Sequence, residues 1–165
     1  MPSLLGGFMS DQSVPGAGQL ATVGKRVVAR IIDAIIMVPI ALILFGGFVS
    51  RSINGDGDIG TGAAFVGGLV GVAIGGIYEV FMTANGGQTL GKKVMKIKIV
   101  RLADGQTPDM NTAVKRWLPN VVGLVPKIGS PLSALIGVAS LVLVFTDSRR
   151  QSVNDKFAQT VVVDA

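Results

Sequence analysis

Long apolar blocks alternate with short polar and basic stretches along this chain. The first block runs from about Val23 to Val49 and the second from about Gly62 to Ala84. Each matches the length of about 20 residues that a helix needs to cross a bilayer. Pro39 lies inside the first block, where membrane helices tolerate proline if neighbours satisfy the freed carbonyl group. The pattern predicts two membrane helices joined by a short Gly-rich loop.

The third apolar region, residues 112–146, is interrupted by three prolines. Asn111 or Thr112 is positioned to cap a helix at its start, and a cleaner apolar run extends from Leu132 to Phe145. One span here would place the basic C-terminal segment outside, against the cytoplasmic preference of Lys and Arg. Two short segments that turn near Lys127–Pro131 would return it to the cytoplasm, and one of them could be re-entrant. One span, two spans and a re-entrant hairpin stay open, and the charge pattern favours two segments.

The polar stretch between these regions predicts a small β element. Residues 94–101 come close to two-residue alternation of apolar and polar side chains, and Asp104-Gly105 follows as a turn signal. The β-branched residues 159–163 could pair with this strand if both lie on one side of the membrane. The expected fold class is an all-α membrane protein with about four transmembrane or re-entrant helices and a small cytoplasmic β element.

Residues 1–22 are expected to form an N-terminal tail that precedes a membrane domain at residues 23–165. The tail is rich in Gly, Pro and Ser, and its apolar run is too short for a signal peptide. It is either disordered or orders on a partner, because four large apolar side chains are more than a plain linker carries. These candidate partner-binding residues are Leu4, Leu5, Phe8 and Met9.

Composition and charge fit a membrane protein. Charged residues make up 15% of the 165 residues, against about 25% in typical soluble domains, and the mean hydropathy is +0.60. The net charge is +5, with the basic residues between the apolar blocks. We therefore expect a multi-pass protein of a prokaryotic plasma membrane with both termini cytoplasmic. Its basic segments should contact anionic lipid headgroups and not nucleic acid.

The residue types narrow the possible chemistry. The chain has no Cys and no His, so thiolate nucleophiles, cysteine zinc sites and the commonest general base are absent. Tyr78 and Trp117 are the single Tyr and the single Trp. We expect neither an enzyme nor a bound metal or cofactor.

Four charged residues in the first two apolar blocks predict a buried charge cluster. Arg26 and Arg30 share a helix face, and Asp33 lies one turn beyond Arg30. Glu79 lies near the cytoplasmic end of the second block, so antiparallel helices would bring all four to similar depth. Charges inside a bilayer are normally paired or face a cavity. The cluster could be an ion or proton site, but a structural ion-pair network is favoured because two Arg would neutralise the acids.

Small residues form a stripe on the second block. Gly67, Gly71 and Gly75 follow one another at intervals of four, and Glu79 continues the same face. Small residues at this spacing let another helix approach closely. The stripe predicts a helix-packing face with Glu79 turned into the interface and away from lipid.

Three sequence motifs carry a resemblance to a known family. They are Arg26-x-x-Ala29-x-x-x-Asp33, Gln88-Thr89-Leu90-Gly91-Lys92-Lys93, and the segment from Asp147 to Val163. In this order, with apolar blocks between them, the chain resembles the RDD family of membrane proteins. The resemblance covers about residues 25–163.

The RDD family takes its name from one Arg and two Asp, and the resemblance matches these three residues to positions in this sequence. It implies that Arg26 is the Arg and Asp33 the first Asp, with Asp155 as the second and Asp147 as the alternative. Asn154 stands before Asp155, where family members often have His or Gly, which speaks against proton transfer there.

The expected function is that of a non-enzymatic accessory or scaffold subunit of a larger membrane assembly, for example a respiratory or transport assembly. Its partners would be other membrane subunits, bound through the small-residue stripe or the apolar N-terminal patch. The alternative is sodium/proton exchange or other ion transport, which the resemblance implies for some family members.

Overall fold

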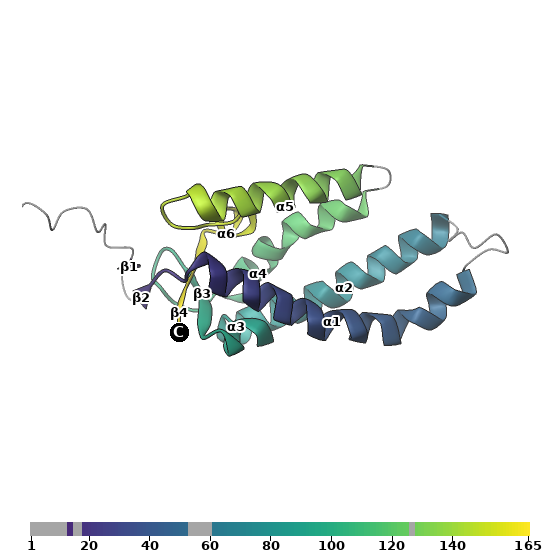
Figure 1. Ribbon diagram of the computed structural model, residues 1–165, viewed down its shortest axis with the longest axis horizontal. Helices are drawn as coiled ribbons and strands as arrows, with labels where there is room; N and C mark the ends of the chain where they lie inside the picture. Colours follow the sequence, from purple (N-terminus) through teal and green to yellow (C-terminus); the bar gives the residue numbers. More distant parts are fainter. Residues whose placement is uncertain (1–12, 15–17, 53–60, 126–127) are drawn as a thin grey trace, which may run out of the picture.

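The computed structural model describes residues 13–14, 18–52, 61–125 and 128–165. Within these ranges the chain is mostly helical, with two short antiparallel sheets. Figure 1 shows two helical arms that extend in the same direction from the end of the molecule that carries β3 and β4. The elements are β1 (Ser13–Val14), β2 (Gly18–Gln19), α1 (Val23–Ser52), α2 (Thr61–Gly86), α3 (Leu90–Val94), β3 (Ile97–Arg101), α4 (Met110–Trp117), the 3-10 helix η1 (Leu118–Leu124), α5 (Gly129–Thr146), α6 (Val153–Phe157) and β4 (Thr160–Asp164).

The first arm is the helical pair α1 and α2, and the expected long helices of the first two apolar blocks are confirmed. Helix α1 has 30 residues and continues through Pro39, and α2 has 26 residues. Two stretches of the described chain, Phe65–Gly86 and Gly129–Thr146, are long and apolar enough to cross a membrane. The second of these is α5, which belongs to the other arm.

The second arm consists of α4, η1 and α5. At about 2 Å per residue, the 7 residues of η1 cover roughly 14 Å, about half of the ~30 Å core of a bilayer. Helix η1 packs against α5. The third apolar region therefore folds back on itself, and η1 is the shorter of its two helices. The structure does not confirm the expected count of four spans. Lys127, at the expected turn, lies outside the described residues.

Apolar side chains on the long helices are exposed over much of their surface, as contact with lipid requires. Exposed large side chains occur on all three long helices, among them Ile35, Val38 and Ile43 on α1, Ile77 and Phe81 on α2, and Leu135, Val138 and Phe145 on α5.

The sheet β3–β4 pairs a strand from the middle of the chain with the strand nearest its C-terminus. The strands are antiparallel, with Ile97 opposite Asp164 and Arg101 opposite Thr160, so the expected pairing of the two β segments is confirmed. Alternation along the strands gives the sheet two buried faces. One face groups Val100, Val161 and Val163 with Leu20, and the other groups Ile97, Ile99 and Val162 with Ala21 and Ala29. Because Ala29 belongs to α1, the second face fixes the start of that helix.

The folded region begins before Val23, the expected start of the domain. Leu20 forms a β-bridge with Val163, and the amide of the buried Ala21 donates to the carbonyl oxygen of Val162 at 3.0 Å. The candidate partner-binding residues Leu4, Leu5, Phe8 and Met9 lie outside the described residues.

Three local elements differ from the expectations. Asp109, and not Asn111 or Thr112, caps α4, because its side chain accepts from the backbone N–H of Thr112 at 3.0 Å. The segment expected as a strand from residue 94 begins as helix α3, and the strand starts only at residue 97. Lys96, with φ of 52°, makes the turn between them. Helix α6 was not expected at all.

Candidate functional site

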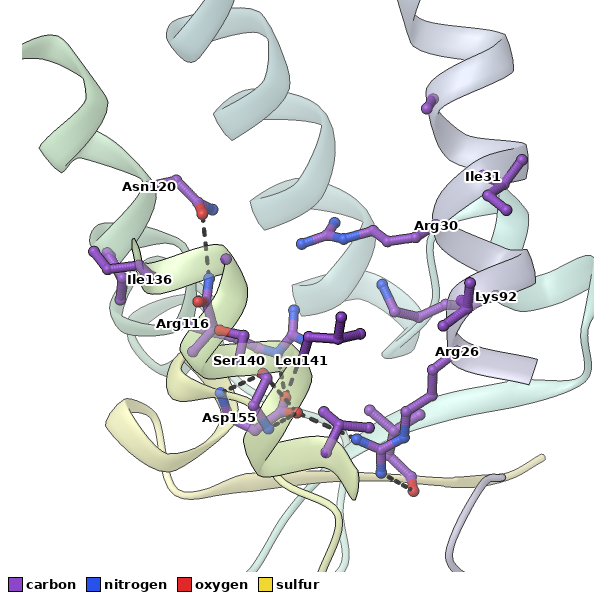
Figure 2. Close-up of a pocket in the computed structure, with 18 of the residues that line it drawn as sticks. Arg26, Arg30, Ile31, Lys92, Arg116, Asn120, Ile136, Ser140, Leu141 and Asp155 are labelled. Carbon is purple, nitrogen blue, oxygen red and sulfur yellow. Dashed lines mark hydrogen bonds and ion pairs between the residues drawn. The ribbon is translucent and has the colours of Figure 1, made fainter. Parts of the chain in front are cut away.

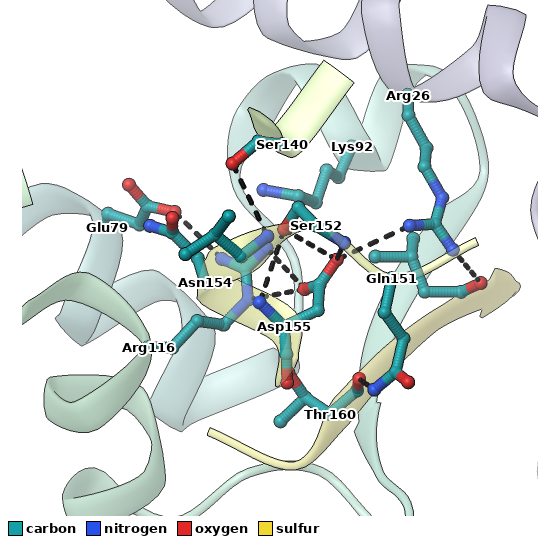
Figure 3. Close-up of polar contacts among 12 residues, drawn as sticks. Arg26, Glu79, Lys92, Arg116, Ser140, Gln151, Ser152, Asn154, Asp155 and Thr160 are labelled. Carbon is teal, nitrogen blue, oxygen red and sulfur yellow. Dashed lines mark hydrogen bonds and ion pairs between the residues drawn. The ribbon is translucent and has the colours of Figure 1, made fainter. Parts of the chain in front are cut away.

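A chain of alternating charges joins the two arms at the sheet end of the molecule (Figure 3). Its centre is the buried Arg116, whose side chain is 7% exposed. Its Nη1 donates to Oε1 of Glu79 at 2.8 Å, and its Nε and Nη2 both donate to Oδ1 of Asp155 at 3.0 and 2.9 Å. One guanidinium on α4 therefore bonds a carboxylate from α2 and another from α6.

Two further Arg side chains, both from α1, form the two ends of this row of alternating charges. Nη1 of Arg26 lies 3.4 Å from Oδ2 of Asp155, and its Nη2 donates to the carbonyl oxygen of Val162 in β4 at 3.0 Å. Arg30 lies 3.4 Å from Oε2 of Glu79, and its side chain is 56% exposed. The order Arg26–Asp155–Arg116–Glu79–Arg30 places each of the two acids between two guanidinium groups.

Asp155 is fixed by the first turn of α6. The backbone N–H and the hydroxyl of Ser152 both donate to Oδ2 of Asp155, and the N–H of Asp155 donates back to the Ser152 hydroxyl, which is a capping box. Burial alone would raise the pKa of Asp155, but Arg116, Arg26 and the Ser152 bonds together hold that pKa below its usual range. The carboxylate therefore stays ionised.

Asp33 does not belong to this row of charges. Its carboxylate accepts hydrogen bonds from neutral donors instead. It accepts from the Tyr78 hydroxyl at 2.9 Å, from the Thr89 hydroxyl at 2.5 Å and from the Gly91 N–H at 2.7 Å. Helix α3 lies so close to α1 here that a Cβ on Gly91 would clash with the carbonyl oxygen of Ala29. Asp33 therefore anchors the start of α3 on α1.

Lys92 on α3 is the remaining buried cation of the site. Its Nζ donates to the Thr89 hydroxyl at 3.2 Å, and no described carboxylate lies within ion-pair distance of it. Burial, with the neighbouring Arg116, lowers the pKa of Lys92 to about 7.

The predicted cluster of four thus divides in two. The structure pairs Arg30 with Glu79 and joins Arg26 to the same ion chain through Asp155, but it separates Asp33 from them. Sequence reasoning missed the residues that connect and divide the cluster: Arg116, Lys92, Tyr78 and Thr89. For the Asp155 side, the spacing Ser152-x-x-Asp155 is a signal that could have predicted the capping box.

The predicted glycine stripe makes no close contact with the part of the chain that the structure describes. A Cβ at Gly67, Gly71 or Gly75 would meet no described atom within 4 Å, whereas one at Gly76 would lie 2.5 Å from the ring of Trp117. Helix α2 packs on α4 through the neighbouring face, and a packing role for the stripe stays a prediction. Glu79 nevertheless points inward, because Arg116 on α4 reaches it.

A cavity of about 610 Å³ lies against the charge chain, between α1 and α5. Figure 2 shows Arg26, Arg30 and Lys92 reaching into this space from one side, opposite Arg116 and Asp155. The rest of its lining is mainly apolar and comes largely from the two helices, with further residues from β3, η1, α6 and β4. Among the described residues, no group of three acids is placed to hold a metal ion.

These features define a mostly helical protein with helices fit to cross a membrane and a charge chain that ties its two arms together. The RDD family model matches residues 20–159, so the chain belongs to the RDD family of membrane proteins, as its motifs indicated. No curated protein and no solved structure matches the chain. Of the two candidates for the second family Asp, Asp155 contacts Arg26, whereas Asp147 pairs with Lys156.

Proposed function

We propose that this RDD family membrane protein is a non-enzymatic accessory or scaffold subunit of a larger membrane assembly. The observation that carries the proposal is the pairing of Glu79 and Asp155, each between two Arg. A site that binds and releases a cation needs acids whose charge is not already balanced. Here both acids serve to join α1, α2, α4 and α6, which is a structural task.

A candidate surface for a partner is the side of α2 that carries Gly67 and Gly71, whereas Gly75 on the same stripe lines a cavity with Arg30 and Met37 of α1. A methyl group added at Gly67, Gly71 or Gly75 would have no described atom within 4 Å, and small residues at this spacing favour close approach of a second membrane helix. We infer that a transmembrane helix of another subunit packs there. The apolar patch at residues 4–9 is a second candidate contact.

The topology belongs to the same proposal: a multi-pass protein of a prokaryotic plasma membrane with both termini cytoplasmic. The start of α1 and the C-terminus lie at the same end of the molecule (Figure 1), and Lys25, Arg26 and Arg150 gather there. The positive-inside tendency supports a cytoplasmic position for this end. A reporter fused to the C-terminus should be active only in the cytoplasm, and activity on the outer side would refute the topology.

The test of the scaffold role is purification of the tagged chain from its native membrane in mild detergent, with co-purifying proteins identified by mass spectrometry. Gly71→Leu should release a membrane subunit, because the added side chain forces the helices apart. Ala73→Leu is the matched control, since it adds an exposed side chain of the same size elsewhere on α2. If both variants retain the same proteins as the wild type, the α2 contact is wrong.

Cation exchange is the second candidate, and Asp33 is the observation that favours it. It is buried at 6% exposure and makes no ion pair among the described residues. The chain reconstituted in liposomes should show no proton flux under a sodium gradient if it is a scaffold. Flux that disappears in Asp33→Asn, in a variant that is still folded and reconstituted to the same level, would establish exchange in its place.

A further inference from the structure

The cavity between α1 and α5 has a charged end and an apolar remainder. Its volume of about 610 Å³ lies within the roughly 300–1,000 Å³ of small-molecule sites. Side chains of both helices form the apolar walls: Val27, Ile31 and Ala34 from α1, and Ile136, Leu141 and Val144 from α5. A ligand that fills this space must be amphipathic, with its polar group at the sheet end.

The charged end favours an anion. Four basic side chains and one acid, Asp155, belong to the lining. Even when the nearby acids Glu79 and Asp33 are added, the four cations outnumber the three acids. The basic lining residues are Arg26, Arg30, Lys92 and Arg116.

Two of these cations, Lys92 and Arg30, have hydrogen-bond donors that few described contacts use. An ammonium group has three donors, and Nζ of the buried Lys92 makes one described hydrogen bond, to the Thr89 hydroxyl at 3.2 Å. Arg30 makes one long contact of 3.4 Å to Glu79 and is 56% exposed. Figure 2 shows both side chains directed into the cavity. A phosphate oxygen placed between them would accept charge-assisted bonds from both.

The position of the cavity favours a lipid headgroup over a soluble anion. Arg26 and Arg30 occupy the first turns of α1, and the apolar walls continue along α1 and α5 into the part of the molecule that exposes apolar side chains to lipid. An anionic headgroup at the membrane surface and an acyl chain below it have the same arrangement. We propose that this cavity binds an anionic glycerophospholipid of the surrounding bilayer, with its phosphate between Arg30 and Lys92 and an acyl chain along α1 and α5. This lipid site does not depend on the scaffold role.

The test is titration of phosphatidylglycerol into the detergent-solubilised full chain, with bound lipid counted by native mass spectrometry. Phosphatidylcholine with the same acyl chains is the neutral comparison. We expect Lys92→Met to weaken binding of phosphatidylglycerol about tenfold, since a charged hydrogen bond contributes that much or more. Lys93→Met is the matched control, because it removes the same charge from an exposed neighbouring residue.

Further variants separate the alternatives. Arg30→Gln should weaken binding as Lys92→Met does, and it keeps the test valid if one of the two variants fails to fold. Gly137→Phe places a ring in the apolar part of the cavity and should exclude phosphatidylglycerol. Equal loss of binding in Lys93→Met, or equal binding of phosphatidylcholine, would overturn the proposal. Displacement of the lipid by an equal concentration of inorganic phosphate would also overturn it, in favour of a soluble anion.

Discussion

Arg116 and Asp155 are 39 positions apart in the sequence, yet Nε and Nη2 of the guanidinium donate to the same carboxylate oxygen at 3.0 and 2.9 Å. The other oxygen of Asp155 accepts from Ser152 and contacts Arg26. One carboxylate therefore joins α4, α6 and α1, and through α1 and α4 it joins the two arms.

Replacing Arg116 should be severely destabilising. Arg116→Met leaves Glu79 and Asp155 buried with one longer ion pair each, at 3.4 Å, and breaking a buried ion pair by removing one partner costs about 3–5 kcal/mol. Lys115→Met removes the same charge from an exposed neighbour and should change the free energy of unfolding by less than about 0.5 kcal/mol. Denaturant unfolding in detergent measures both, and similar losses in the two variants would contradict a central role of Arg116.

Adding a methyl group at Gly91 should separate α3 from α1. In Gly91→Ala the new Cβ would clash with the carbonyl oxygen of Ala29 and lie 3.0 Å from Cγ of Asp33, so α3 must shift and lengthen the Asp33 bond. Overpacking of this kind costs about 1–3 kcal/mol, seen as a lower melting temperature. In Gly86→Ala, the control, the new Cβ meets no described atom within 4 Å, and the melting temperature should stay near that of the wild type.

Acid should weaken the fold through Asp155. Its pKa is lowered in the folded chain, so the folded state binds fewer protons than the unfolded state near that pKa. The stabilisation is fully present above the unfolded pKa of about 3.9 and is lost as the pH falls through the lowered folded pKa. Melting temperatures measured from pH 6 to pH 2 should therefore decline below about pH 4, and Asp155→Asn should show a shallower decline. Identical slopes for the two chains would exclude Asp155 as the cause.

Lipid binding should weaken as the pH rises. The charged groups that face Lys92 are Arg116, Glu79, Arg30 and Asp33, and burial among them lowers the pKa of Lys92 to about 7. Above this pH the amine loses its proton and its attraction for phosphate. Affinity for phosphatidylglycerol should fall between pH 7 and pH 9 in the wild type and stay level in Lys92→Met. A level profile in the wild type would show that the Lys92 charge is not used.

Much of the architecture could be predicted from local pattern. Apolar blocks at residues 23–49 and 62–84 gave α1 and α2, because helix length follows the length of the apolar block. Alternation at residues 94–101 and β-branched content at 159–163 predicted the pairing that the structure shows between 97–101 and 160–164. Prolines in the third region indicated a break, and the structure has two separate helices there, η1 and α5.

The connections at the site could not be predicted in the same way. Periodicity places Arg30, Asp33 and Glu79 on faces of their own helices, but it does not specify which face meets which neighbour. The close contact of α2 with α4 is made by Gly76, which lies against the ring of Trp117, and not by the adjacent Gly75. Arg116 is the centre of the charge cluster because it bonds Glu79 and Asp155, which lie 37 and 39 positions away in the sequence.

The contact between Arg26 and Asp155 also bears on the order of events during synthesis. The two residues are 129 positions apart, and at about 5–20 residues per second the carboxylate follows the guanidinium by roughly 6–26 s. Helices α1 and α2 are completed within that interval, whereas Asp155 and strand β4, which fix the start of α1, are made only at its end and after it. Until then the start of α1 is held only by its contacts with α2 and α3. Truncation before Asp155 would leave the start of α1 without its ion pair to α6 and without the buried face that β4 supplies.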